Sequence, residues 1–102
     1  MSENQLQELA FIKECSEEIL QMALSEQWES IENKQEERDN LLTTFFSQEL
    51  VLESEFIAKN INAVLNIDSQ IVNLVRNYKN ELQSELKKIV NGKNAVKAYS
   101  TG

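Results

Sequence analysis

Hydrophobic side chains in the first quarter of the chain recur at the three- and four-residue spacing of an α-helix. The positions on this stripe are Leu6, Leu9, Ser16, Ile19 and Ala23, broadened by Ile12, Leu20 and Leu24. Glutamates occupy the other face, so the pattern predicts a first helix over about residues 3 to 24. Ser25 offers an N-cap, followed by Glu26 and Glu29 in a first turn, where the helix dipole favours negative charge. A link this short predicts an antiparallel hairpin.

The second helical segment has a seam that is apolar at both ends and polar in the middle. Its members, spaced by three and four residues, are Trp28, Ile31, Gln35, Arg38, Leu42 and Phe45. We expect Trp28 to pack in the core beside the hairpin turn, the alternative being an anchor for a partner. Two placements are open for Arg38: its stem packs at the seam edge with its head in water, or it pairs with a glutamate of the first helix.

The longest periodic segment follows residues 43 to 54, which we interpret as the frayed end of the second helix and a connection. Heptad spacing is kept by Ile57, Ile61, Val64, Asp68, Ile71, Val75, Tyr78, Leu82, Glu85 and Ile89. This spacing predicts a helix from about residue 54 to 90, ending near Gly92, which can adopt the left-handed conformation after a helix. It would be roughly 55 Å long, against roughly 30 Å for each earlier helix. The surplus apolar surface needs a cover: a homodimer partner, the C-terminal "KNAVKAYSTG", or a helix of another protein.

These elements predict an all-α protein, a single domain over residues 1–102 built as an antiparallel three-helix bundle with a long third helix and coiled-coil-like packing. The composition agrees, because the chain has no proline and only two glycines. The N-terminal "MSENQLQELAF" is acidic and lacks the long apolar core of a secretory signal. The longest apolar run, "LAFI", is far short of the roughly 20 residues that cross a bilayer. We therefore expect a cytosolic protein without membrane insertion.

Side chains suited to catalysis are scarce. The chain has no histidine, so Cys15 has no imidazole to activate it, and the usual zinc and di-iron ligand sets are missing. A single cysteine forms no internal disulfide, and we expect Cys15 to be a small apolar residue on or beside a packing face. There is also no glycine-rich phosphate loop. The sequence therefore predicts no enzyme, no catalytic residue, no metal site and no cofactor.

Charge is distributed unevenly along the chain. Residues 1 to 55 hold 14 acidic and 3 basic side chains, whereas residues 56 to 102 hold 3 acidic and 7 basic ones. The basic side chains of the last third are Arg76, Lys79, Lys87, Lys88, Lys93 and Lys97. The acidic majority of so small a domain repels phosphate at short range, which disfavours a nucleic-acid partner. An acidic protein partner fits the remaining positive charge better.

Two blocks of the sequence, "QWESIENKQEERDNLL" and "AVLNIDSQIVNLVRNYKNELQSELKKIVNGKNAVKAY", together resemble the FliT family of flagellar export chaperones. The first is similar to the family's Trp-Asp/Glu-x-Leu/Ile, Glu/Gln-x-Arg and Leu-Leu arrangement. The second is similar to the family's second block. The matching residues are Trp28, Ile31, Arg38, Leu41 and Leu42, then Asp68, Ile71, Leu82, Leu86, Gly92, Ala95, Ala98 and Tyr99. Together the blocks span about half of the chain.

The resemblance implies a small cytosolic helical chaperone for flagellar type III export. Such a protein holds the filament-cap protein FliD before export, prevents its premature assembly and escorts it to the export machinery. Some family members also bind components of the export apparatus. Two rival functions fit the periodicity and charge: a helical adaptor or other secretion chaperone unconnected with flagella, and a transcription-linked regulator acting through the basic third helix.

A binding hypothesis follows for the third helix. We expect the C-terminal segment of FliD to bind as an amphipathic helix against the second and third helices. The predicted contacts are the apolar Val72, Val75, Tyr78 and Leu82, with Arg76 and Lys79 at the rim. For each of these residues the alternative is a place in the intramolecular core.

Overall fold

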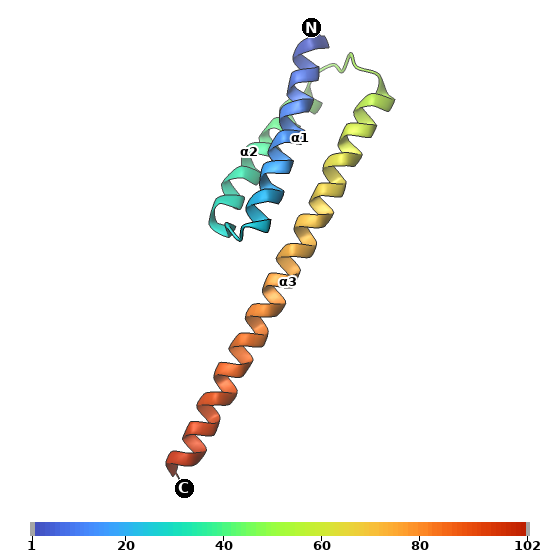
Figure 1. Cartoon of the computed structure of the whole chain (residues 1–102). Helices are drawn as coiled ribbons and strands as arrows, with labels where there is room; N and C mark the ends of the chain where they lie inside the picture. Colours follow the sequence, from blue (N-terminus) through green and yellow to red (C-terminus); the bar gives the residue numbers. More distant parts are fainter. Residues whose placement is uncertain (1, 102) are drawn as a thin grey trace. The chain divides into compact units, whose positions relative to one another are not determined.

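The computed structural model describes the backbone of residues 2–101 and the side chains of residues 4–92, and it contains three helices (Figure 1). They are α1 (Ser2–Leu24), α2 (Trp28–Ser47) and α3 (Ser54–Thr101). No residue between 2 and 101 forms a strand. The predicted all-α fold with a long third helix is confirmed.

The contacts divide the chain into two compact units, Met1–Val72 and Asn73–Gly102. The first unit contains α1, α2 and the first part of α3. The second unit consists of the rest of α3. In the first unit α1 and α2 lie side by side as an antiparallel hairpin, and the first part of α3 completes a three-helix bundle (Figure 1).

The hairpin turn differs from the prediction at Ser25. Its N–H still donates to the carbonyl of Gln21 at 3.0 Å, so it continues the last turn of α1 instead of capping α2. Glu26 reverses the chain with a positive φ of 58°. Gln27 is the N-cap of α2 and makes no side-chain capping hydrogen bond. Trp28, predicted beside this turn, is the first residue of α2 and is half-buried.

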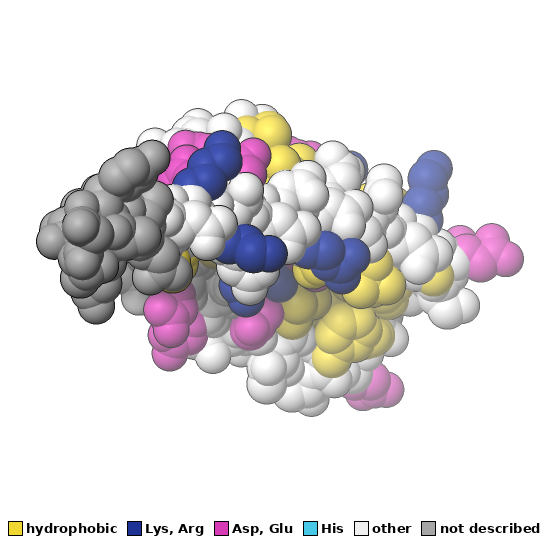
Figure 2. All heavy atoms as spheres, turned by 90° about the horizontal axis from the view of Figure 1, so that it is seen from below, with side chains coloured by type: hydrophobic (Ala, Val, Ile, Leu, Met, Phe, Trp, Pro, Cys, Tyr) yellow, Lys and Arg dark blue, Asp and Glu magenta, His cyan; other side chains and the backbone are white. Residues whose placement is uncertain are grey.

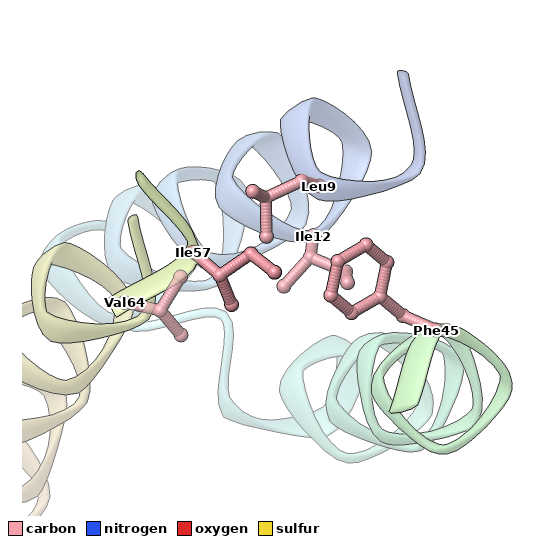
Figure 3. Packing of buried hydrophobic residues seen from close by; sticks show 5 residues of the cluster. All are labelled: Leu9, Ile12, Phe45, Ile57 and Val64. Atoms are coloured by element: carbon pink, nitrogen blue, oxygen red, sulfur yellow. The ribbon is translucent and has the colours of Figure 1, made fainter. Parts of the chain in front are cut away.

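The core of the first unit draws on all three helices. Leu9 and Ile12 of α1 point toward Phe45 of α2 and toward Ile57 of α3, beside Val64 (Figure 3). Phe45 and Ile12 are completely buried. Full burial of a side chain of this size contributes on the order of 2 kcal/mol by removing apolar surface from water. The bundle therefore depends on α3 contacts as well as on the hairpin.

A buried glutamine fixes the connection between α2 and α3. The side-chain amide of Gln5 donates to the carbonyl of Glu49 and accepts from the N–H of Val51, both at 2.9 Å. Gln5 thus provides hydrogen-bond partners for two backbone groups of the loop that have no partner in a helix. Leu50 and Leu52 of the same loop pack against the core cluster. These contacts anchor the chain just before α3 begins.

The predicted end of α3 near Gly92 is wrong, because the helix continues to Thr101. A C-terminal glycine cap requires a positive φ, and no described glycine has one. A Cβ added at Gly92 would meet nothing within 4 Å. Gly92 is therefore an ordinary exposed position inside a helix.

Candidate partner-binding surface

The heptad seam of α3 is packed in the first unit. Ile57, Val64 and Ile71 are buried, and Ile61 is half-buried and packs against the core cluster. Their alternating spacing of four and three residues keeps one face of a helix toward its neighbours, as in coiled coils. In this part of the chain the predicted seam and the core are the same surface.

A polar cluster interrupts this seam. Arg38 of α2 is 7% exposed, and its Nη1 donates to the carboxylate of Asp68 on α3 and to the hydroxyl of Ser16 on α1, the latter at 3.5 Å. Neither placement predicted for Arg38 holds: the side chain is buried, and its carboxylate partners are Asp68 of α3 and, at 3.5 Å, Asp39 of α2, not a glutamate of the first helix. The signal in the sequence was Asp68, a carboxylate at a seam position between the apolar Val64 and Ile71. A buried cation requires such a partner.

A second ion pair joins the two helices of the hairpin. The ammonium of Lys34 on α2 lies 2.7 Å from Glu18 of α1 and 3.4 Å from Glu37. The hydrogen bond that Lys34 donates to Glu18, helped by the one that it donates to Glu37, raises the pKa of Lys34 above its ordinary value. Lys34 is therefore positively charged in the folded protein at neutral pH.

Cys15 is a packed side chain. It is 7% exposed, which confirms the prediction of a small apolar residue on a packing face. Burial raises the pKa of its thiol, because the thiolate loses hydration. A neutral buried thiol is a poor nucleophile, so its environment offers no activation.

Beyond Val72 the seam continues in sequence, but its side chains are at most half-buried. Leu82, Leu86, Ile89 and Val90 are between 40% and 60% exposed. None of the side chains described from Asn73 to Gly92 is buried. Hydrophobic side chains are visible on the surface beside charged ones in Figure 2. A row of large exposed apolar residues on one helix is typical of a surface that binds a partner.

The predicted contact residues occupy this region of α3. Val72 is 53% exposed and Leu82 is 40% exposed, whereas Val75 and Tyr78 are half-buried. The basic residues Arg76 and Lys79 are exposed. Helical spacing places Val75, Tyr78 and Leu82 on one stripe, with Val72 and Lys79 along its edge and Arg76 farther round the helix.

Three exposed apolar residues were missing from the predicted contact set: Leu86, Ile89 and Val90. Ile89 keeps the heptad spacing, which would have identified it. Leu86 and Val90 lie off the narrow seam, and only their exposure reveals them. The apolar surface is thus longer than the sequence prediction.

Other kinds of site find little support. Within the described part of the chain, no group of three or more histidine, cysteine, aspartate or glutamate side chains is placed to hold a metal ion. A search of the described helices for a segment able to cross a membrane found none.

Comparison with known proteins gives one match. The family model described as "Flagellar protein FliT" matches residues 6–101, nearly the whole chain. No curated protein and no solved structure matches the chain. The match covers both sequence blocks that resemble this family and extends between and beyond them.

Proposed function

The chain belongs to the FliT family of flagellar export chaperones, and from this we propose that it binds the filament-cap protein FliD in the cytosol and prevents its premature assembly. The bound ligand is the C-terminal segment of FliD, which docks on α3 as an amphipathic helix. The proposal treats residues 1–102 as one chaperone domain without a nucleic-acid or membrane partner.

The observation that carries the proposal is the exposed apolar surface of α3 after Ile71. Val72, Val75, Tyr78 and Leu82 supply the apolar contacts, and Arg76 and Lys79 form the rim. Burying Val72 and Leu82, which are 53% and 40% exposed, removes apolar area from water and so favours association. A helix that presents residues at positions i, i+3, i+4 and i+7 is the complement of such a stripe.

Charge supports the same partner class. The stretch Asn73–Gly102 contains six basic and two acidic side chains, a net charge of +4. Carboxylates beside the apolar stripe of the FliD helix would meet Arg76 and Lys79, which accelerates association and fixes orientation more than it adds affinity. We expect binding to weaken as salt increases.

Two further partners belong to the proposal. Components of the export apparatus receive the complex, as the family's role implies. A second copy of this chain is the competing occupant of the apolar stripe. If the chain forms a homodimer through this stripe, binding of the FliD segment would dissociate the dimer, because both use the same apolar residues.

Calorimetric titration with the C-terminal segment of FliD from the same organism tests the proposal. We expect saturable binding at one segment per chain with a Kd on the order of micromolar or tighter, and a loss of at least about tenfold in Val75→Asp and Tyr78→Asp. The matched control is Asn80→Asp, an exposed position on the other face of α3, which should leave the Kd unchanged.

A helical melt of each variant separates an interface from a core residue. An unchanged melt with lost binding supports the proposal. A collapsed melt for Val75→Asp and Tyr78→Asp would show that these side chains belong to the core. No detectable heat at several temperatures, with a segment active toward another chaperone, would refute FliD as the partner.

A further inference from the structure

A second candidate surface lies within the first unit and shares no residue with the FliD contacts. Two hollows adjoin between α1 and the first part of α3, and both are lined by Lys13, Phe56 and Asn60. The first hollow extends to Leu6 and Ala10 of α1. The second extends along α3 to Lys59 and Ala63. We call the surface formed by these seven residues the Lys13–Lys59 groove.

The groove offers an apolar floor that water still reaches. Leu6 and Phe56 are 42% and 43% exposed, although both line a concave surface. Ala10 and Ala63 are small and leave space beside these large side chains. A helix laid between two helices fills such a space with aliphatic side chains, because small residues allow close approach.

The Lys13–Lys59 groove contains two lysines, although the surrounding unit is strongly acidic. Met1–Val72 contains 15 acidic and only 4 basic side chains, a net charge of −11. Two of its basic residues are neutralised within the protein, since Lys34 pairs with Glu18 and Arg38 with Asp68. The other two, Lys13 and Lys59, form no ion pair with any described residue.

Both of these unpaired cations line the same hollow. The remaining polar side chains of that hollow are amides, Asn60, Asn62 and Asn66, and none of its lining residues is acidic. Two lysines beside an apolar floor favour a carboxylate that comes with a hydrophobic side chain. Glu14 and Glu17 line the adjoining hollow, so only the hollow with Lys13 and Lys59 suits carboxylates, and the apolar side chains of the partner lie against the other. A long polyphosphate that extended into both hollows would be repelled by the two glutamates, which disfavours nucleic acid.

We propose that the Lys13–Lys59 groove is a second docking surface, which binds an acidic amphipathic helix of a partner protein. The helix places aliphatic side chains against Leu6 and Phe56 and carboxylates at Lys13 and Lys59. None of these residues belongs to the FliD contact set. The two surfaces share no residue, so the proposal is independent of the proposed function.

Two synthetic helical peptides of about 18 residues test the proposal. Both carry leucines at three- and four-residue spacing, and the flanking positions are glutamates in one and lysines in the other. Binding is followed by NMR through the side-chain amides of Asn60, Asn62 and Asn66, which line the hollow. We expect the glutamate peptide to shift these amides and to bind roughly fivefold to tenfold more tightly than the lysine peptide.

Charge reversal distinguishes the groove from the basic end of α3. Lys13→Glu/Lys59→Glu should reverse the preference of the two peptides, whereas Lys79→Glu/Lys88→Glu should leave the amide shifts unchanged. Loss of the shifts in the second variant and their persistence in the first would overturn the proposal. So would an equal response to a single-stranded oligonucleotide, which would identify a general polyanion site.

Folding of the variants is checked separately. Lys13→Gln/Lys59→Gln removes the charge without adding carboxylates to an already acidic unit. It should keep the melt of the parent protein and abolish the preference between the two peptides. A preference that survives neutralisation of both lysines would also overturn the proposal.

Discussion

The two parts of α3 carry one periodic pattern in two environments. Between Ile57 and Ile71 the apolar seam residues are packed, and Asp68 meets the buried Arg38. From Leu82 to Val90 the apolar residues are exposed. The period of a helix fixes which residues share a face, but it does not say what that face contacts. A core stripe and a binding stripe therefore look alike in the sequence.

Polar content gives a better distinction between the two parts. The packed part contains a buried ion pair, which holds α3 against α2 in one register, because slipping α3 would leave Arg38 with only the exposed Asp39 of its own helix. The exposed part carries basic residues such as Arg76 and Lys79, whose side chains lie at the surface. A buried ion pair that fixes the register of two helices is expected in a core. Charged side chains around an apolar centre are expected in a docking surface.

The largest expected difference between the parts concerns apolar truncation. Phe45→Ala removes a fully buried ring that packs with α3 residues and should cost about 4 kcal/mol of unfolding free energy, measured by urea denaturation. Leu86→Ala, at a 60% exposed position, should cost less than about 0.5 kcal/mol. Similar costs for the two variants would break the comparison.

The ion pair gives the next largest effect. Asp68→Ala leaves the buried Arg38 with only the exposed Asp39 as its carboxylate partner. It should cost about 3 kcal/mol, the low end for breaking a buried pair, because Asp68 is 32% exposed and Asp39 remains. The double variant Arg38→Met/Asp68→Ala should recover most of this loss in the same denaturation experiment. Equal stability of Asp68→Ala and the parent would show that the pair does not fix the packed part.

A helix-stabilising substitution sharpens the account of the exposed part. Gly92→Ala should stabilise α3 locally by about 1 kcal/mol and increase far-UV helicity, because Gly92 is inside the helix with no steric obstacle. Had Gly92 been a left-handed cap, alanine would destabilise the end of the helix instead. The sign of the change in helicity decides between the two.

The smallest effect is on pH dependence in the packed part. The folded pKa of Cys15 lies above its unfolded value, so unfolding favours the thiolate and stability should fall as pH rises through the ordinary thiol range, near 8.5 to 9. The urea midpoint should therefore decrease slightly from about pH 8 to 9.5. Cys15→Ala should remove that part of the slope, and an unchanged slope would contradict the burial of an ionisable thiol.

Sequence reasoning predicted the helices well and their ends poorly. The periodicity gave three helices and the seam of α3, because amphipathic spacing follows directly from burial of one face. It misplaced the cap at Ser25, since the turn depends on Glu26 adopting a positive φ. It also ended α3 at Gly92, because a glycine in isolation favours a cap as readily as an exposed helical site.

The candidate site could be predicted only in part. Val75, Tyr78 and Leu82 follow the seam and were found by spacing. The exposure of Leu86 and Val90 depends on which neighbours α3 has, and spacing carries no such information. The pairing of Arg38 with Asp68 was also missed, because a carboxylate at a seam position indicates a buried partner but its identity depends on the register of α2 and α3.

Hydrogen exchange measured with and without the C-terminal segment of FliD tests the central claim most directly. In the free protein the account predicts slow amide exchange for residues 57–71 and faster exchange for residues 73–92. Adding the segment should slow exchange in residues 73–92 and leave residues 57–71 unchanged. Equal protection of both stretches in the free protein, or protection gained only within residues 4–71, would contradict the division of α3 into a core part and a binding part.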